Sequence, residues 1–119
     1  MSDLQEPATP EKKQHFVLLG RVKDFFRDQP EEVKQELDDI IWKLERYGCL
    51  NYPYGEKIGG EKLFVMRMQN RNIRVFYVYG LYDRVYGIHG YIKKTETIPE
   101  YELKQARRML KLLTQKGAL

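Results

Sequence analysis

Apolar side chains recur along the chain with the two spacings that distinguish helices from strands. A helical stripe runs from Val33 to Leu44 and stops at Gly48, a residue type that favours a helix C-terminus. Asp28 and Glu31 form a capping arrangement ahead of the stripe. These signals together predict an amphipathic helix.

A second helical pattern precedes this one. The segment RVKDFFRD (21–28) places its apolar residues at helical spacing, and a turn signal follows at Gln29 and Pro30. The two helices are therefore expected to form a hairpin. The run HFVLLG (15–20) is too short for its period to be read, so it is open between a first strand and the lead-in to a helix.

Three later runs have the length and composition of strands: LFVMRMQ (63–69), IRVFYVYG (73–80) and RVYGIHGYI (84–92). Short links of three residues join them. Parallel strands need much longer crossovers, so an antiparallel meander is expected. The preceding segment (49–62) contains one proline and three glycines and is expected to be a loop.

A last helix is predicted after the third strand. Thr97 and Glu100 form another capping signature, and Gly117 is a plausible stop. Between them lies an apolar stripe made of Leu103, Ala106, Leu110 and Leu113. The order of elements predicts an α+β fold, with an N-terminal helical hairpin packed on a small antiparallel meander and a C-terminal helix.

Length and composition favour one domain. With 119 residues, of which 42% are hydrophobic, a single domain over residues 15–119 is expected, preceded by a flexible polar tail over residues 1–14. Cys49 is the only cysteine, which excludes an intrachain disulfide and favours the reducing cytosol. No apolar stretch resembles a signal peptide or a membrane span, so a cytoplasmic protein without a membrane partner is expected.

Positive charge is concentrated in one third of the chain. The formal net charge is +4, but residues 57–94 contain eight Lys or Arg residues and only two acidic ones. The rest of the chain is slightly acidic. This distribution favours a polyanionic partner for the predicted sheet.

Four cations on the predicted strands are candidates for a phosphate-binding site: Arg67, Arg74, Lys93 and Lys94. The first and third strands should flank the central one, so these side chains could meet on one surface, although alternation alone does not establish a shared face. Each also has a simpler interpretation. Arg74 could form a structural ion pair, and the lysines could be a solvated strand end.

Other residues have weaker chemical signals. His89 lies within an apolar strand, which is more typical of a hydrogen-bonded core residue than of a catalyst. No acidic cluster within the sheet suggests a divalent metal, so no metal or cofactor is expected. The remaining candidates for nucleic-acid contacts are Lys57, Lys62, Arg71 and Tyr101.

The segments LFVMRM, IRVFYVY and HGYIKKTETIPEYELKQARRM, in this order, resemble the RelE superfamily of bacterial toxins, and within it the HigB-like, phage-derived branch. The resemblance covers about residues 20–115. Its most specific part is the aromatic-x-Lys-Lys-Thr segment, followed by a proline and a helix with an alanine.

The resemblance implies the toxin of a type II toxin–antitoxin system, a ribosome-dependent endoribonuclease that cuts mRNA without a metal. An RNA 2′-hydroxyl would attack the adjacent phosphate. Arg74 matches the family's central-strand arginine, and Arg67 matches a basic position on the preceding strand. Lys93 and Lys94 match the basic pair after the last strand, and a lysine crowded by cations suits an acid or base role. The HigB-like pattern has a glutamate where this chain has Val65, which removes a partner for a neighbouring cation.

Two alternatives stay open at this level. A ParE-like toxin of the same superfold would inhibit DNA gyrase by binding, since fold does not imply function. An inactive relative that binds RNA or a partner is the other. For the nuclease, the expected partners are mRNA on the ribosome and a cognate antitoxin, a small helix-turn-helix protein with an acidic or amphipathic segment.

Overall fold

The computed structural model describes residues 11–119, which fold into three helices and a five-stranded sheet. The elements in chain order are β1 (His15–Leu18), α1 (Gly20–Arg27), α2 (Glu31–Tyr47), β2 (Gly55–Lys57), β3 (Phe64–Arg67), the 3₁₀ turn η2 (Asn70–Asn72), β4 (Ile73–Tyr79), β5 (Arg84–Ile92) and α3 (Glu100–Gln115). The predicted α+β class is confirmed.

The strands lie in the order β1-β5-β4-β3-β2. The three predicted strands are confirmed as the antiparallel neighbours β3, β4 and β5. The run from residue 15 begins with a strand, β1, which is parallel to β5, so the sheet is mixed and extends beyond the expected meander.

The prediction of a loop over residues 49–62 was wrong at β2, because a glycine followed by two charged residues carries no strand alternation. Gly55 begins this strand under tight packing. An added Cβ would lie 2.5 Å from the Cβ of Leu50 and 2.8 Å from the hydroxyl of Tyr77. β2 pairs antiparallel with β3 and forms one edge of the sheet.

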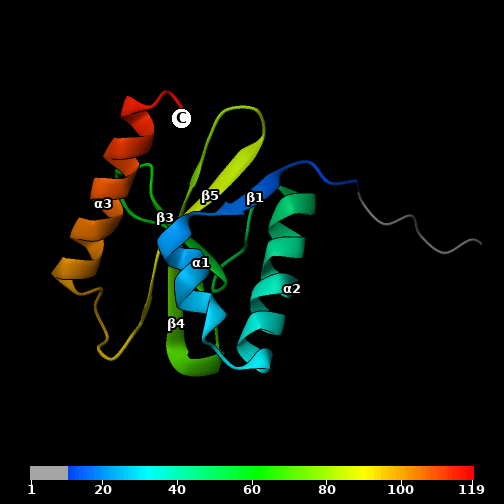
Figure 1. Cartoon of the computed structure of the whole chain (residues 1–119), viewed down its shortest axis with the longest axis vertical. Coiled ribbons are helices and arrows are strands. Elements are labelled where there is room, and N and C mark those ends of the chain that lie inside the picture. Colours follow the sequence, from blue (N-terminus) through cyan, green and yellow to red (C-terminus); the bar gives the residue numbers. More distant parts are fainter. Residues whose placement is uncertain (1–10) are drawn as a thin grey trace, which may run out of the picture.

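Each face of the sheet carries its own hydrophobic core. α1 and α2 cover one face, and α3 covers the other (Figure 1). Val22, Val33 and Leu44 pack with β-strand residues such as Val75 on the first face. The core beneath α3 is formed by Leu63, Val65, Phe76, Val78, Ile88, Tyr91, Ala106 and Leu113. The alternation of β4 explains both cores, since successive side chains point to opposite faces.

Helices α2 and α3 begin two residues later than their capping patterns predicted. Pro30 is the N-cap of α2 and Pro99 that of α3, and neither end has a side-chain cap. The Asp28 and Thr97 capping arrangements were therefore wrong, because an extended proline directly precedes each first turn. The predicted stop at Gly48 is confirmed, since it adopts the left-handed conformation that glycine tolerates (φ 82°).

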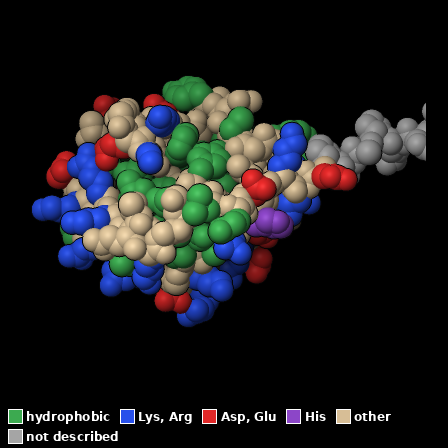
Figure 2. Space-filling view, turned by 90° about the horizontal axis from the view of Figure 1, so that it is seen from above, with side chains coloured by type: hydrophobic (Ala, Val, Ile, Leu, Met, Phe, Trp, Pro, Cys, Tyr) green, Lys and Arg blue, Asp and Glu red, His purple; other side chains and the backbone are tan. Residues whose placement is uncertain are grey.

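α1 packs chiefly on β5, while α2 packs on β1 and on η2. The pairing of α1 with α2 as a helical hairpin stays a prediction. The view from above shows Lys and Arg side chains gathered on the flank that α3 occupies, beside hydrophobic and uncharged groups (Figure 2).

The first described residues of the chain are held against α2 by Glu45, whose carboxylate is buried. Its side chain accepts a hydrogen bond from the Phe16 amide (2.8 Å) and pairs with Lys12 (3.1 Å). Its carbonyl accepts from the amides of Lys13 and Gln14. These contacts involve the last residues of the expected tail, and residues 1–10 lie outside the described part of the chain. Within residues 11–119, no helix combines the length and apolar character needed to cross a membrane.

Candidate functional site

The pairing of β3, β4 and β5 aligns two predicted site residues, Arg67 and Arg74, with a third residue, Tyr91, in one row across the sheet. Arg67 on β3 pairs directly with Arg74 on β4, and Arg74 pairs with Tyr91 on β5. Tyr91 belongs to the core beneath α3, so the row lies on that face of the sheet. Directly paired positions share a face, which places both arginines beside this tyrosine.

A pocket of about 190 Å³ opens over this row. Its basic lining residues are Lys57, Arg67, Arg74 and Lys93, and Glu56 is its carboxylate. Its remaining walls are Ile58, Gly59, Val65, Tyr91 and Ile98. Three of the four cations predicted for a phosphate site therefore share one pocket.

Arg74 carries positive charge that no acid neutralises among the described residues. Its Nη1 atom donates to the carbonyls of Ile73 (3.2 Å) and Met68 (3.5 Å), and it has no ion-pair partner in residues 11–119. Partial burial, and secondarily the charge of Arg67, lowers the pKa of Arg74 from its ordinary value. A guanidinium starts from so high a pKa that it stays protonated, so the pocket holds a cation available to an anion.

Arg67 is paired with a carboxylate from the neighbouring strand. Its Nη2 atom donates to Glu56 on β2, and its guanidinium also lies 5.3 Å from the centre of the Tyr52 ring. Glu56 pairs in register with Val65, the position where the HigB-like pattern has a glutamate. Glu56 on the adjacent strand thus supplies Arg67 with the carboxylate that Val65 cannot provide, whereas Arg74 has no acidic partner among the described residues.

Tyr91 was missed from the sequence and is the polar group most enclosed in the pocket. Only 6% of it is exposed, and its hydroxyl has no hydrogen-bond partner among the described residues. Its ring stacks with that of Phe76, 5.9 Å between centres. Burial is the main cause that raises the pKa of the Tyr91 phenol. Strand alternation offered a signal, since Tyr91 lies two residues before Lys93.

The two lysines differ in position. Lys93 is partly buried, lines the pocket, and its amide donates to the Asn72 carbonyl (2.9 Å). Lys94 is exposed and lies outside this pocket. It lines a neighbouring open depression of about 460 Å³ together with Asn72, Arg74 and Lys93. Arg74 and Lys93 border both hollows, so the lysine pair spans their shared rim.

The predicted nucleic-acid contacts are only partly gathered here. Lys57 lines the pocket, whereas Lys62 and Tyr101 are exposed and line neither hollow. Tyr101 is 67% exposed in the first turn of α3. Arg71 lies on η2, where its Nη1 atom donates to the Gln29 side chain (3.3 Å).

His89 is occupied by a structural contact. Its Nε2 atom lies 2.9 Å from the Glu102 carboxylate of α3, and both side chains are about four-fifths buried. A bulge in β5 allows this, because Phe76 pairs with His89 while Tyr77 pairs with Gly87, leaving Ile88 as the extra residue. His89 does not line the basic pocket.

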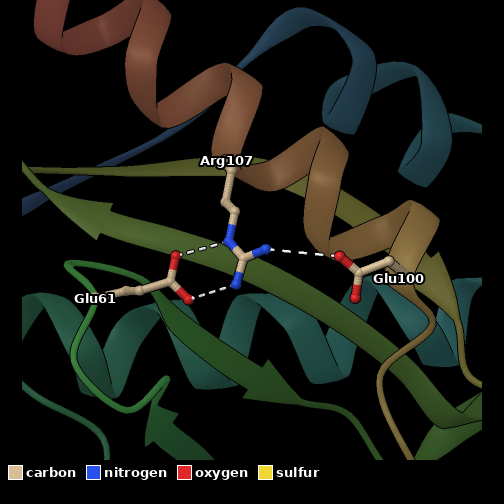
Figure 3. Close-up of polar contacts among 3 residues, drawn as sticks. All are labelled: Glu61, Glu100 and Arg107. Carbon is tan, nitrogen blue, oxygen red and sulfur yellow. Dashed lines mark hydrogen bonds and ion pairs between the residues drawn. The ribbon is translucent and has the colours of Figure 1, made fainter.

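A bidentate ion pair holds the β2–β3 loop, which forms one wall of the pocket. Arg107 on α3 donates from Nε and Nη2 to the two oxygens of Glu61, at 2.8 and 2.9 Å, and lies 3.7 Å from Glu100 (Figure 3). The hydrogen bonds from Arg107 lower the pKa of Glu61, and those to Glu61 raise the pKa of Arg107. The planar fork fixes the loop against α3, next to Ile58 and Gly59.

Comparison with known proteins adds one finding to this geometry. A search of the curated proteins finds no match to the chain. The family model described as "Phage derived protein Gp49-like" matches residues 24–111, which include the second half of α1, all of α2, all of the strands after β1, most of α3 and every cation of the pocket. The chain therefore belongs to the phage-derived Gp49-like family, a RelE-like family of toxin type.

Proposed function

We propose that this chain is the toxin of a type II toxin–antitoxin system, of the HigB-like branch, and that it is a ribosome-dependent mRNA endoribonuclease of the cytoplasm. A helix-turn-helix antitoxin that covers the basic surface would inhibit it. The observation that supports this most directly is Arg74, which shares the pocket with Arg67, Lys93 and the hydroxyl of Tyr91. Within residues 11–119, neither the Arg74 charge nor this hydroxyl has a neutralising or hydrogen-bonding side-chain partner. Membership of a toxin-like family supports the same proposal.

The reaction needs charge stabilisation first. When an RNA 2′-hydroxyl attacks the adjacent phosphorus, negative charge grows on the non-bridging oxygens. Arg74 and Arg67 suit this task because guanidinium groups bind phosphate at two points and stay protonated. They are also held in place before substrate arrives, Arg67 by Glu56 and Arg74 by backbone carbonyls. Donors that are already oriented stabilise a transition state without further reorganisation.

The reaction also needs two proton transfers. One group accepts the proton of the 2′-hydroxyl, and another donates a proton to the departing 5′-oxygen. Lys93 and Lys94 are the candidates from the sequence. Glu56 is a further candidate acceptor. Tyr91, whose pKa is raised, keeps its proton at neutral pH and is a candidate donor to the phosphate or the leaving oxygen. The products would be a cyclic phosphate and a 5′-hydroxyl.

The test replaces Arg74 with alanine and compares it with Arg84→Ala, a control arginine that is exposed at the start of β5 and outside the pocket. Expression of the unmodified chain should stop growth and create new mRNA ends that primer extension detects at codons. Arg74→Ala should abolish both effects while its melting temperature stays near that of the unmodified chain, and Arg84→Ala should retain them.

Three outcomes would contradict the proposal. Full toxicity of Arg74→Ala would remove this arginine from the site. Growth arrest without new mRNA ends would favour a ParE-like inhibitor of gyrase, and no growth arrest at all would favour an inactive relative.

A further inference from the structure

A second surface combines aromatic rings with cations at the end of α2 and in the loop that follows it. Three cation–π pairs lie here: Arg46 over Trp42 at 4.6 Å, Lys43 over Tyr54 at 5.3 Å, and Arg67 over Tyr52 at 5.3 Å. Such pairs occur about once per 70–80 residues in proteins, so three pairs within one part of this chain are more than its length predicts. We call this the aromatic–cationic surface.

The rings of this surface are open to solvent. Tyr52 is 71% exposed and Tyr47 is 57% exposed, and Trp42 and Tyr54 are also among the exposed large side chains. A depression of about 310 Å³ is lined by Tyr47, Tyr52 and Tyr54 together with Lys43 and Cys49. Trp42 lies outside this lining, and its ring centre is 6.2 Å from that of Tyr47. Exposed aromatic rings around a hollow leave flat π-faces available to a ligand.

The charge of this part of α2 is positive. The exposed acidic residues of the helix lie between Glu31 and Asp39, whereas the charged residues beyond Ile40 that reach the surface are the exposed Lys43 and the partly exposed Arg46. Glu45 lies in the same turns but is 8% exposed and is bound to the Phe16 amide. The one acidic residue in these turns of α2 is therefore buried, and the charges beside the aromatic rings are positive.

The aromatic–cationic surface is continuous with the basic pocket. Arg67 lines the pocket and at the same time lies over the ring of Tyr52. The backbone supports this connection, since the Arg67 amide donates to the Tyr54 carbonyl (2.9 Å). A chain whose phosphate occupies the pocket can thus extend past Tyr52 toward α2.

We propose that the aromatic–cationic surface binds the single-stranded RNA that flanks the phosphate in the pocket, by stacking its bases on Tyr52, Tyr54 and Trp42. This rests on the proposed function for the identity of the polymer. Cations beside rings match the alternation of phosphate and base in a single strand, and every base offers a π-face. The surface therefore contributes affinity with little sequence preference.

The test measures binding of uncleavable RNA, so that it does not depend on nuclease activity. Fluorescent 2′-O-methyl oligouridine of about 12 nucleotides is compared with an oligomer of the same length and charge without bases. The unmodified chain should bind the oligomer with bases more tightly. Tyr52→Ala and Trp42→Ala should each weaken that binding by roughly 5- to 100-fold and leave the affinity for the oligomer without bases unchanged. Tyr52→Phe keeps the ring and should bind normally.

The matched control is Tyr82→Ala, since Tyr82 is the most exposed tyrosine (82%) and lies in the β4–β5 link, outside this surface. It should bind both oligomers as the unmodified chain does. Cys49 gives an independent readout because it is the only cysteine, is exposed and lines the depression. Oligouridine with bases should slow its reaction with a thiol reagent several-fold, and the oligomer without bases should not.

Equal binding of the two oligomers by the unmodified chain, or an unchanged preference in Tyr52→Ala and Trp42→Ala, overturns the inference. Protection of Cys49 by the cognate antitoxin and not by RNA also overturns it, since the surface would then bind protein. The nuclease is judged separately by the new mRNA ends. If the chain cleaves mRNA but Tyr52→Ala and Trp42→Ala still prefer the oligomer with bases, only the stacking surface is disproved. If that preference depends on these rings but no mRNA is cleaved, only the nuclease is disproved.

Discussion

At the scale of single residues, the pocket keeps its positive charge against an energetic cost. Arg67 and Arg74 face each other across two antiparallel strands, and like charges in that position are destabilising. Of these two arginines, only Arg67 has a carboxylate partner among the described residues. Arg74 is partly buried and lacks one, so a bound phosphate would relieve the repulsion and the lost hydration together.

The hydroxyl of Tyr91 should contribute to activity and not to stability. Tyr91→Phe keeps the ring on Phe76 and removes an enclosed hydroxyl that has no partner among the described residues. The free energy of unfolding should stay equal or rise slightly, because an unpaired buried polar group is lost. If the hydroxyl transfers a proton, cleavage should fall about 10²- to 10⁴-fold. Primer extension and urea denaturation measure the two effects.

The control for this prediction is Tyr86→Phe, on the same strand and the same core but outside the pocket. Undiminished cleavage by Tyr91→Phe would assign the tyrosine a packing role alone.

Glu56 should affect the chemistry more than the fold. The Glu56–Arg67 pair is partly exposed, at 45% and 28% for the two side chains, and such pairs are worth at most about 1 kcal/mol. Glu56→Gln should therefore change the free energy of unfolding little, while cleavage falls because Arg67 loses its anchor or the 2′-hydroxyl loses its proton acceptor. A rise in KM alone indicates that Glu56 serves only substrate binding through Arg67, and a fall in kcat indicates a role in transition-state stabilisation or proton transfer. Glu100→Gln, on the exposed start of α3, is the control, and equal activity of both variants would contradict the assignment.

At the scale of elements, the link between β3 and β4 decides where the arginines lie. Arg71 and Asn72 in this link adopt left-handed backbone conformations (φ 60° and 50°), which are unfavourable for residues with side chains. Glu36 on α2 holds the link from outside, accepting hydrogen bonds from the amides of Gln69 (2.7 Å) and Asn70 (2.9 Å). A helix on the opposite face thus stabilises the hairpin that carries Arg67 and Arg74.

Glu36→Ala should lower the free energy of unfolding by about 1.5–3 kcal/mol, since hydrogen bonds to a charged group are worth this much. Chemical denaturation followed by circular dichroism measures the change. Asp38→Ala is the matched control, because Asp38 is an exposed acid on the same helix without a hydrogen bond or ion pair among the described residues. Equal midpoints for the two variants would show that the backbone holds the link by itself.

At the scale of the whole molecule, the sheet separates the core beneath α1 and α2 from the face that carries the basic pocket. α1 and α2 close the first face with a continuous core, and α3 lies over the second face (Figure 1). The row of Arg67, Arg74 and Tyr91 on that second face lines the basic pocket together with Ile98, two residues before α3. Three tyrosines inside this architecture, Tyr77, Tyr79 and Tyr91, have a raised pKa, with burial as the largest cause in each case.

These tyrosines predict alkaline unfolding. A raised pKa in the folded state means that the folded chain holds its phenol protons more tightly than the unfolded chain, whose tyrosines ionise near a pKa of about 10. The stabilising contribution is complete below that pH and is lost as the pH rises above it. The free energy of unfolding should therefore fall above about pH 10. Urea titrations across this range measure the slope.

Tyr79→Phe should make the slope shallower, and Tyr82→Phe, at an exposed position, should leave it unchanged. A slope that is the same in all three chains would mean that the buried phenols do not govern alkaline stability.

The sequence by itself determined the local elements and most of the cations of the site. Period and turn signals predicted β3, β4, β5 and all of the helices, because alternation and helical spacing are properties of neighbouring residues. The same alternation made Arg67 and Arg74 candidates, since a short link allows the two strands to pair. The starts of α2 and α3 were misjudged because an extended proline took the N-cap position from Asp28 and Thr97.

Only the tertiary structure decided which distant residues meet. Glu56 lies on a strand of three residues with no periodic signal, and only its pairing with Val65 places its carboxylate beside Arg67. Tyr52 lies in a loop and reaches the pocket through the same arginine. The parallel pairing of β1 with β5 joins segments about seventy residues apart. Local patterns cannot specify such contacts, because strand pairing and burial depend on how separate segments pack together.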